Sequence, residues 1–392
     1  MRKAILIVLA LTFVMAWFAC ESGKGPEVTL NESMAVAARE GKPLLMDFYA
    51  EWCGPCKRFT AASHEDADLM KALGEVILHK VDCEKGEGVE LAKKFDIRGY
   101  PTFILANSAG EPISRWMGYS KENFLENLSK ATGDLTTIDE KIARFQQNPT
   151  VDDAIALADY SYSKDDYKGA VTYFTTAQEL DPANDYAYDI FSNTVYGVYS
   201  DDFTYDDAVK AANKIFESDN IENQVHVAGS LAALAEHLNK LDDMAMYLEK
   251  AIALVDKTDN PEIKDYAKTL HVKHSLYVKA DTAEAIEYQK STYGDEWMND
   301  PGKLNSFAWW CYEEGVNLEE AEQYAKKAAD LEQPGSARAM ILDTVAHICK
   351  ARGNMTDAIK YMQKAVEEDP NNDAWKETLE EFQQEAQDQP VS

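Results

Sequence analysis

Two cysteines separated by two residues are the groups in this sequence best suited to chemistry. They are Cys53 and Cys56, in the segment Trp52–Lys57 (WCGPCK). The preceding run, Leu44–Glu51, is largely apolar and aromatic and has the length of a strand, so we expect the pair where a strand turns into a helix. A helix N-terminus favours negative charge, and the thiolate is the reactive form of cysteine. We therefore expect Cys53 to be an exposed nucleophile that attacks a disulfide, and Cys56 to resolve the mixed disulfide.

A Cys-x-x-Cys pair can also form half of a zinc site. A site with four cysteines needs a second pair, and no His-x3–5-His follows the motif closely. The other cysteines are scattered along the chain: Cys20, Cys83, Cys311 and Cys349. The spacing therefore favours redox chemistry, and we predict no metal site.

A carboxylate within the predicted strand supports the redox interpretation. Asp47 lies six residues before Cys53 among apolar residues, where a charge has little structural use. A buried carboxyl has a raised pKa and can exchange the proton that Cys56 must lose or gain. The alternative is an aspartate on an edge strand that faces solvent.

These residues resemble a known family. Asp47–Lys57 is similar, almost residue for residue, to the active-site segment of thioredoxins, and Phe95–Phe103 (FDIRGYPTF) resembles a second mark of that family. The resemblance covers residues 30–133. It implies a cis Pro101 opposite the cysteines, with the backbone of the preceding residue pairing with substrate. The substrate-binding residues implied in this way are Trp52, Gly54, Pro55, Tyr100, Pro101 and Gly118. The redox-active disulfide is the only cofactor implied.

The order of elements expected in residues 30–133 is β, α, β, α, β, β, α, after an alanine-rich helix over Met34–Glu40. Thioredoxins carry a proline that kinks the helix after the cysteines, and this sequence has none there. Instead, Ser63–Asp66 predicts a break and a new helix start. In this respect the sequence resembles the thioredoxin-like C-terminal domain of periplasmic thiol-disulfide transporters.

The first residues form a predicted targeting segment. Arg2 and Lys3 precede an apolar run, Ala4–Phe18, that is short for a membrane-spanning helix. The pair Ala19-Cys20 resembles the end of a bacterial lipoprotein signal. We expect a signal peptide over residues 1–19, lipidation of Cys20 and a tether over residues 20–29. Ordinary signal cleavage nearby and an uncleaved anchor are the alternatives; each places the chain in a cell envelope or periplasm.

The composition limits the partners. The formal charge of −30 argues against nucleic acid and against anionic lipid surfaces, although it also serves solubility. The six cysteines do not form a disulfide framework. Cys83 follows a predicted strand and is a possible third thiol near the active pair; the alternative is an unpaired thiol at a strand end. Cys311 and Cys349 fit buried helical positions.

From Val151 onward the pattern becomes helical and repeats. A small or apolar anchor recurs at steps of 36 to 41 residues. The anchors are Ala170, Ala208, Met244, Ala285, Ala321 and Ala358. This pattern resembles tetratricopeptide repeats, whose usual period is ~34 residues.

We predict about six helical hairpins over residues 151–392, joined to the first domain by a linker helix over residues 134–150. Such hairpins stack into a superhelix whose concave surface binds peptides or proteins. Trp309, Trp310 and Tyr312 either line that surface or fill the space between helices.

The predicted fold is therefore an α/β thioredoxin-like domain followed by an all-α superhelix of tetratricopeptide type. The favoured function is a cell-envelope thiol-disulfide oxidoreductase that reduces protein disulfides, with the repeats recruiting client or partner proteins. The Gly-Pro between the cysteines resembles the reducing members of the family, and no NADPH or flavin motif is present, so an upstream electron donor is required. The alternative is an envelope scaffold or chaperone-like lipoprotein that uses the thioredoxin fold mainly for docking.

Overall fold

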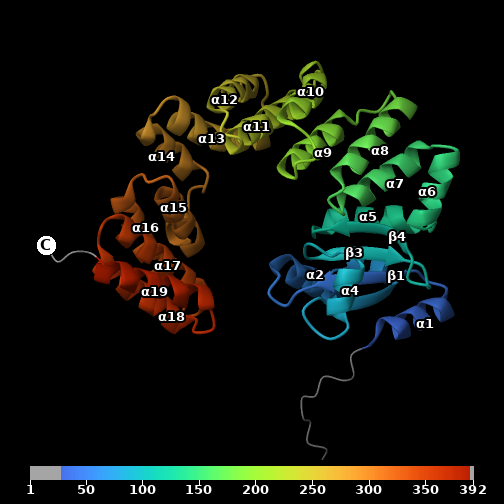
Figure 1. Cartoon of the computed structure of the whole chain (residues 1–392), viewed down its shortest axis with the longest axis horizontal. Helices are drawn as coiled ribbons and strands as arrows, with labels where there is room; N and C mark the ends of the chain where they lie inside the picture. Colours follow the sequence, from blue (N-terminus) through green and yellow to red (C-terminus); the bar gives the residue numbers. More distant parts are fainter. Residues whose placement is uncertain (1–27, 389–392) are drawn as a thin grey trace, which may run out of the picture. The chain divides into compact units, whose positions relative to one another are not determined.

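A computed structural model describes residues 28–388 (Figure 1). The predicted signal peptide over residues 1–19, Cys20 and most of the predicted tether lie outside the described residues. The chain divides into two compact units, the first ending at Asn184 and the second beginning at Asp185. Within residues 28–388, no helix has the length and apolar character needed to span a membrane.

The first unit is built on a four-stranded sheet in the order β2-β1-β3-β4. The strands are β1 (Leu44–Tyr49), β2 (Ile77–Asp82), β3 (Thr102–Ala106) and β4 (Pro112–Met117). β1 is parallel to β2 and antiparallel to β3, and β3 and β4 form a hairpin. β1 is thus an inner strand. Its nearly continuous apolar sequence follows from burial on both faces of the sheet.

Helices cover both faces of this sheet. Leu45 and Phe103 belong to a core with α2 (Gly54–Glu65), α3 (Ala67–Leu73) and α5 (Lys121–Gly133). On the opposite face, the neighbouring side chains of β1 belong to a core with α1 (Leu30–Glu40) and α4 (Gly88–Lys94). Asp66 caps α3 by accepting hydrogen bonds from the backbone N–H groups of Asp68 and Leu69, which confirms the predicted helix break.

Three further helices belong to the first unit: α6 (Ile138–Gln147), α7 (Val151–Tyr162) and α8 (Tyr167–Leu180). α6 and α7 contact β4, the edge strand, whose unpaired backbone groups would otherwise be open to another chain. The side chain of Arg144 on α6 pairs with the buried Asp153 on α7, at 2.5 Å and 2.8 Å, and joins the two helices. The predicted boundaries at residues 133 and 150 stay a prediction. The first helical hairpin, α7–α8, lies in the same compact unit as the sheet.

The second unit is helical in its described part. Its helices are α9 (Ala187–Tyr199), α10 (Tyr205–Phe216), α11 (Ile221–His237), α12 (Leu241–Val255), α13 (Pro261–Lys273), α14 (Thr282–Ser291), α15 (Pro301–Glu313), α16 (Leu318–Leu331), α17 (Ser336–Ala351), α18 (Met355–Glu368) and α19 (Asp373–Asp388). A short π-helix (His274–Val278) precedes α14, and a 3-10 turn (Trp297–Asn299) precedes α15. Consecutive helices pair as hairpins, and neighbouring hairpins stack in chain order (Figure 1).

The repeat is visible in two features of all six hairpins, α7–α8 included. The six predicted anchor residues are all at most 2% exposed. A residue with positive φ lies in the turn between the two helices of each hairpin: Asp165, Asp201, Asn239, Ala280, Asn317 and Gly353. Asn, Asp and Gly tolerate this left-handed conformation best. Trp309 and Tyr312 are half-buried and contact the ring of His347, with centroids 5.8 Å and 5.4 Å away, which supports packing between helices.

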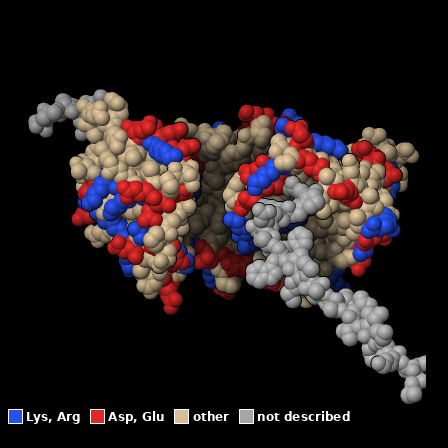
Figure 2. Space-filling model, turned by 90° about the horizontal axis from the view of Figure 1, so that it is seen from below, with Lys and Arg blue, Asp and Glu red and all other residues tan. Residues whose placement is uncertain are grey.

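Charged side chains are scattered over the surface among uncharged ones. On the face shown in Figure 2, Lys and Arg occur in small groups among Asp and Glu, in keeping with the formal charge of −30. A net charge this far from zero makes the molecules repel one another, which favours solubility.

Candidate active site

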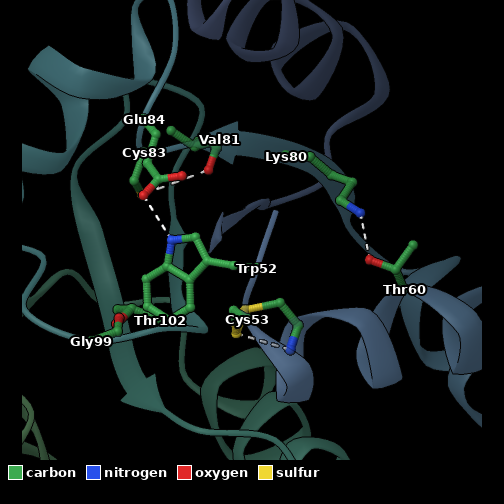
Figure 3. The surroundings of a disulfide bond; sticks show 10 residues. Trp52, Cys53, Thr60, Lys80, Val81, Cys83, Glu84, Gly99 and Thr102 are labelled. Atoms are coloured by element: carbon green, nitrogen blue, oxygen red, sulfur yellow. Dashed lines mark hydrogen bonds between the residues drawn. A yellow bond between two sulfur atoms is a disulfide. The ribbon is translucent and has the colours of Figure 1, made fainter. Parts of the chain in front are cut away.

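Cys53 and Cys56 form a disulfide at the N-terminus of α2 (Figure 3). Cys53 is the N-cap residue, and its Sγ accepts a hydrogen bond from the backbone N–H of Cys56 at 3.1 Å. The expectation of an exposed Cys53 is wrong, because both cysteines are 3% exposed. The physical reason is that the rings of Tyr49 and Tyr100 pack against the sulfur pair together with Ala50.

Trp52 lies beside the disulfide and is 67% exposed. Its indole Nε1 donates a hydrogen bond to Glu84 Oε1 at 2.8 Å (Figure 3). The Tyr100 ring lies edge-on to the indole, with the ring centroids 5.8 Å apart. Lys85, next in the same loop, pairs with Glu51 at 2.6 Å. The loop after β2 is therefore bound to the active-site segment at two points. Sequence reasoning missed Glu84; the available signal was its place just after a strand that runs parallel to β1.

The Tyr100–Pro101 peptide bond is cis, as the resemblance implied. The Pro101 carbonyl accepts a hydrogen bond from the backbone N–H of Gly118 at 2.9 Å. Thr102, at the start of β3, pairs with Met117 at the end of β4 and lies beside the end of β1. Pro101 and Gly118 thus lie at the same end of the sheet as the disulfide. Gly118 has φ +80° and open space where a Cβ would point, so a substrate backbone can approach it closely.

Asp47 is buried in the inner strand β1 and only 1% exposed, which excludes the edge-strand alternative. Its side chain shares the face of Leu45, the face that α2 covers. Burial raises the pKa of the Asp47 carboxyl from 3.8 to about 7, and the charge of Lys80 opposes this rise. Lys80 is the partner of Asp47 in the β1–β2 register, and its Nζ donates to Thr60 Oγ1 at 2.7 Å. The carboxyl can therefore exchange a proton near neutral pH.

The comparisons with known proteins agree with this geometry. The thioredoxin family model matches residues 28–130, and a tetratricopeptide repeat model matches residues 341–372. Residues 28–130 form a thioredoxin domain. The predicted fold class, a thioredoxin-like domain followed by a helical repeat region, is confirmed.

Two curated relatives are similar to part of this chain. The thiol:disulfide interchange protein DsbD of Salmonella typhimurium is 36% identical over 94 residues, which is 23% of this chain and 16% of that protein. The protein disulfide-isomerase of Oryctolagus cuniculus is 33% identical over 141 residues, or 35% of this chain and 27% of that protein. This chain thus spans less than a third of either relative. The C-terminal domain of Neisseria meningitidis DsbD in the oxidised form has 27% identity and a TM-score of 0.22, covering 25% of this chain and 88% of that structure.

A cleft of about 420 Å³ opens beside Cys56 in the thioredoxin domain. Cys56, Thr60 and Lys80 line it together with Lys57. Because Lys80 is also the register partner of Asp47 and its charge acts on that carboxyl, the cleft brings Cys56 and a residue that influences Asp47 into one lining. Lys80 is a second residue that sequence reasoning missed, since the register of two parallel strands cannot be read from their sequences.

Cys83 is 7% exposed, and its Sγ lies 3.7 Å from the Val81 carbonyl. It also hydrogen-bonds with the side chain of Tyr100, whose ring packs against the sulfur pair. Burial raises the pKa of Cys83 to about 12, so the residue stays a neutral thiol at neutral pH. Its surroundings favour the alternative of an unpaired thiol at a strand end. Among residues 28–388, no cluster of three or more His, Cys, Asp or Glu could hold a metal ion.

This burial gives a labelling prediction. Cys83, Cys311 and Cys349 are all buried, and burial raises their pKa values to about 12, 12 and 11. Iodoacetamide at pH 8 should leave all three unmodified in the native oxidised protein, because the thiolate is the form that reacts. All three should react in denaturant, as read by peptide mass mapping. Rapid native alkylation of Cys83 would instead indicate an accessible third thiol.

Proposed function

We propose that the protein is a cell-envelope thiol-disulfide oxidoreductase that reduces disulfides in client proteins. The observation that carries the proposal is the Cys53–Cys56 disulfide at a helix N-terminus, with cis Pro101 at the same end of the sheet and buried Asp47 beneath α2. This arrangement supports the proposed roles of Cys53 as nucleophile, Cys56 as resolving thiol and Asp47, with its pKa raised to about 7, as proton acceptor.

The reaction starts from the reduced pair. The Cys53 thiolate attacks one sulfur of the client disulfide, forming a mixed disulfide and releasing a client thiolate that takes up a proton. Cys56 gives its proton to Asp47 and attacks Cys53 Sγ, which forms the Cys53–Cys56 bond and releases the second client sulfur as a thiolate that takes up a proton. Two electrons pass from the pair to the client disulfide. An upstream electron donor must then reduce the pair again, and no other cofactor is needed.

The client is proposed to bind over Trp52, Gly54, Pro55, Tyr100, Pro101 and Gly118. Gly54 and Gly118 are exposed, and Trp52 provides the largest apolar surface beside the disulfide. An extended client backbone would pair with the Tyr100 backbone, which brings its sulfur to Cys53. Binding through backbone groups suits an enzyme that accepts clients of different sequence.

The envelope location and the role of the repeats belong to the same proposal. The location rests on the lipoprotein-like start of the sequence, with Cys20 as lipidation site, and on the similarity to DsbD. The helical hairpins are proposed to recruit clients or a partner protein, as stacked hairpins commonly do.

A trapping experiment tests this function. Cys56→Ala removes the resolving thiol, so mixed disulfides between Cys53 and clients should accumulate and run as adducts on non-reducing gels. The double variant Cys53→Ala with Cys56→Ala is the control and should give none. Recovery of the same partners from both variants, without any covalent adduct, would favour the scaffold alternative instead.

A further inference from the structure

The turn of the first helical hairpin is bound to the loop over residues 95–101 of the thioredoxin domain. This loop carries cis Pro101 and is called the substrate loop below. Arg98 lies two residues before Tyr100, and its NH1 donates to Asp165 Oδ2 in the α7–α8 turn at 3.1 Å. Its Nε and NH2 donate to the two carboxylate oxygens of Asp96 at 3.2 Å and 3.1 Å. Arg98 thus joins the loop that carries cis Pro101 to the repeat that follows the domain.

A second arginine holds the same loop from the sheet. Arg115 on β4 is 4% exposed and donates to the carbonyls of Phe95 and Asp96, at 2.5 Å and 2.8 Å. The start of the substrate loop is therefore fixed between the edge strand and the α7–α8 turn. Because the loop and the hairpin are already held in place, a partner that binds between them would cause little further loss of conformational entropy.

Between the loop and the hairpin lies a cleft of about 640 Å³. Its walls include Asp96 and Arg98 from the loop, Tyr160 from α7, and Lys164, Asp166 and Lys168 from the hairpin turn and α8. The cleft is therefore lined by three cationic side chains and two carboxylates, although the formal charge of the whole chain is −30.

Lys164 is the cation of this cleft that is open to a new partner. Its Nζ lies 5.8 Å from the Tyr160 ring centroid, and its charge, after the hydrogen bond from Arg98, helps to lower the pKa of Asp96, but within residues 28–388 no carboxylate forms an ion pair with it at 4 Å or less. By contrast, Arg98 already holds two carboxylates. An acidic group that enters the cleft would therefore find Lys164 available.

We propose that this cleft is a subsite for the client polypeptide, and that it takes an aspartate or glutamate close to the client's reacting cysteine. The inference rests on the proposed function. A client strand that pairs with the Tyr100 backbone continues past Gly99 and Arg98, which are consecutive in the chain and lead to the cleft. Lys164 then pairs with the client carboxylate. The first hairpin thereby determines which cystines are reduced fastest.

The test uses the full reduced protein and disulfide-linked synthetic peptides. Two peptide series have the same sequence except for Glu or Lys at two to four residues on either side of the cysteine. The wild type should reduce the best Glu peptide with a kcat/KM about fivefold above its Lys counterpart, the range for one partly exposed ion pair. Lys164→Glu should abolish or reverse this preference, and Lys164→Met should abolish it without adding a negative charge.

The matched control is Lys71→Glu, the same charge change at an exposed position on α3 and outside the cleft. It should keep the preference for the Glu peptide. The proposal is overturned if the wild type shows no preference, or if Lys71→Glu and Lys164→Glu change it equally, which would be an effect of overall charge. Absence of turnover with every peptide would instead overturn the proposed function, and this subsite with it.

Discussion

Replacing Cys53 with serine is expected to reduce the insulin-disulfide reductase activity of this protein to the rate of dithiothreitol alone. Cys53 caps α2, where the helix dipole and the backbone N–H of Cys56 stabilise a sulfur anion. A serine hydroxyl stays protonated at neutral pH and cannot form a mixed disulfide. Because every later step starts from that intermediate, the loss should be complete, and the turbidity of precipitating insulin B chain measures it directly.

The control for this experiment is Cys349→Ala, which also removes one buried thiol but in α17 of the second unit. This variant should keep the wild-type rate. Unchanged turnover in Cys53→Ser would contradict the reaction proposed here, and the protein would then fit the scaffold alternative better.

The sequence was sufficient where local chemistry determines the structure. The break before Asp66 was predicted because an aspartate at that place can cap a new helix, and it does. The anchors Ala170 and Ala358 were predicted from spacing, and both are fully buried where two helices touch. Asp47 was predicted to be a buried carboxyl because a charge has little structural use within an apolar strand, and the structure places it in an inner strand of the sheet. The signal is either a local residue pattern, as at Asp66 and Asp47, or a regular repeat of such a pattern along the chain, as for the anchors.

The sequence was insufficient where residues far apart in the chain meet. Arg98 and Asp165 are 67 positions apart, and their ion pair depends on how a repeat packs against a sheet edge. Glu84 reaches Trp52 because β1 and β2 end at the same edge. The burial of Cys53 depends on Tyr100, 47 residues later, whose ring packs against the sulfur pair. No local pattern encodes these distances, so they follow only from the tertiary fold.

Asp47→Asn should slow disulfide reduction at pH 8 by about 100-fold, the usual scale of a lost acid–base group. Cys56 must lose a proton before it can attack the mixed disulfide, and Asp47 lies under the helix that carries it. In the wild type, burial raises the Asp47 pKa to about 7, so the rate should fall as pH drops below 7. The variant should lack this inflection and should accumulate mixed disulfide. A wild-type profile in the variant would assign the proton to another group.

The same substitution should make the protein more stable at high pH. Burial raises the Asp47 pKa from 3.8 to about 7, so between these values the folded state holds a proton that the unfolded state has lost. Stability therefore falls as pH rises through this window, by about 4 kcal/mol in total at 1.36 kcal/mol per pH unit. Asp47→Asn removes this loss, so its advantage in urea unfolding should be much larger at pH 8.5 than at pH 4. Asp139→Asn, the same change at an exposed position on α6, is the matched control and is unfolded at the same two pH values. If the difference in unfolding free energy between Asp47→Asn and the wild type did not change with pH, the pKa of Asp47 would not be raised in the folded state. The proton acceptor would then be another group.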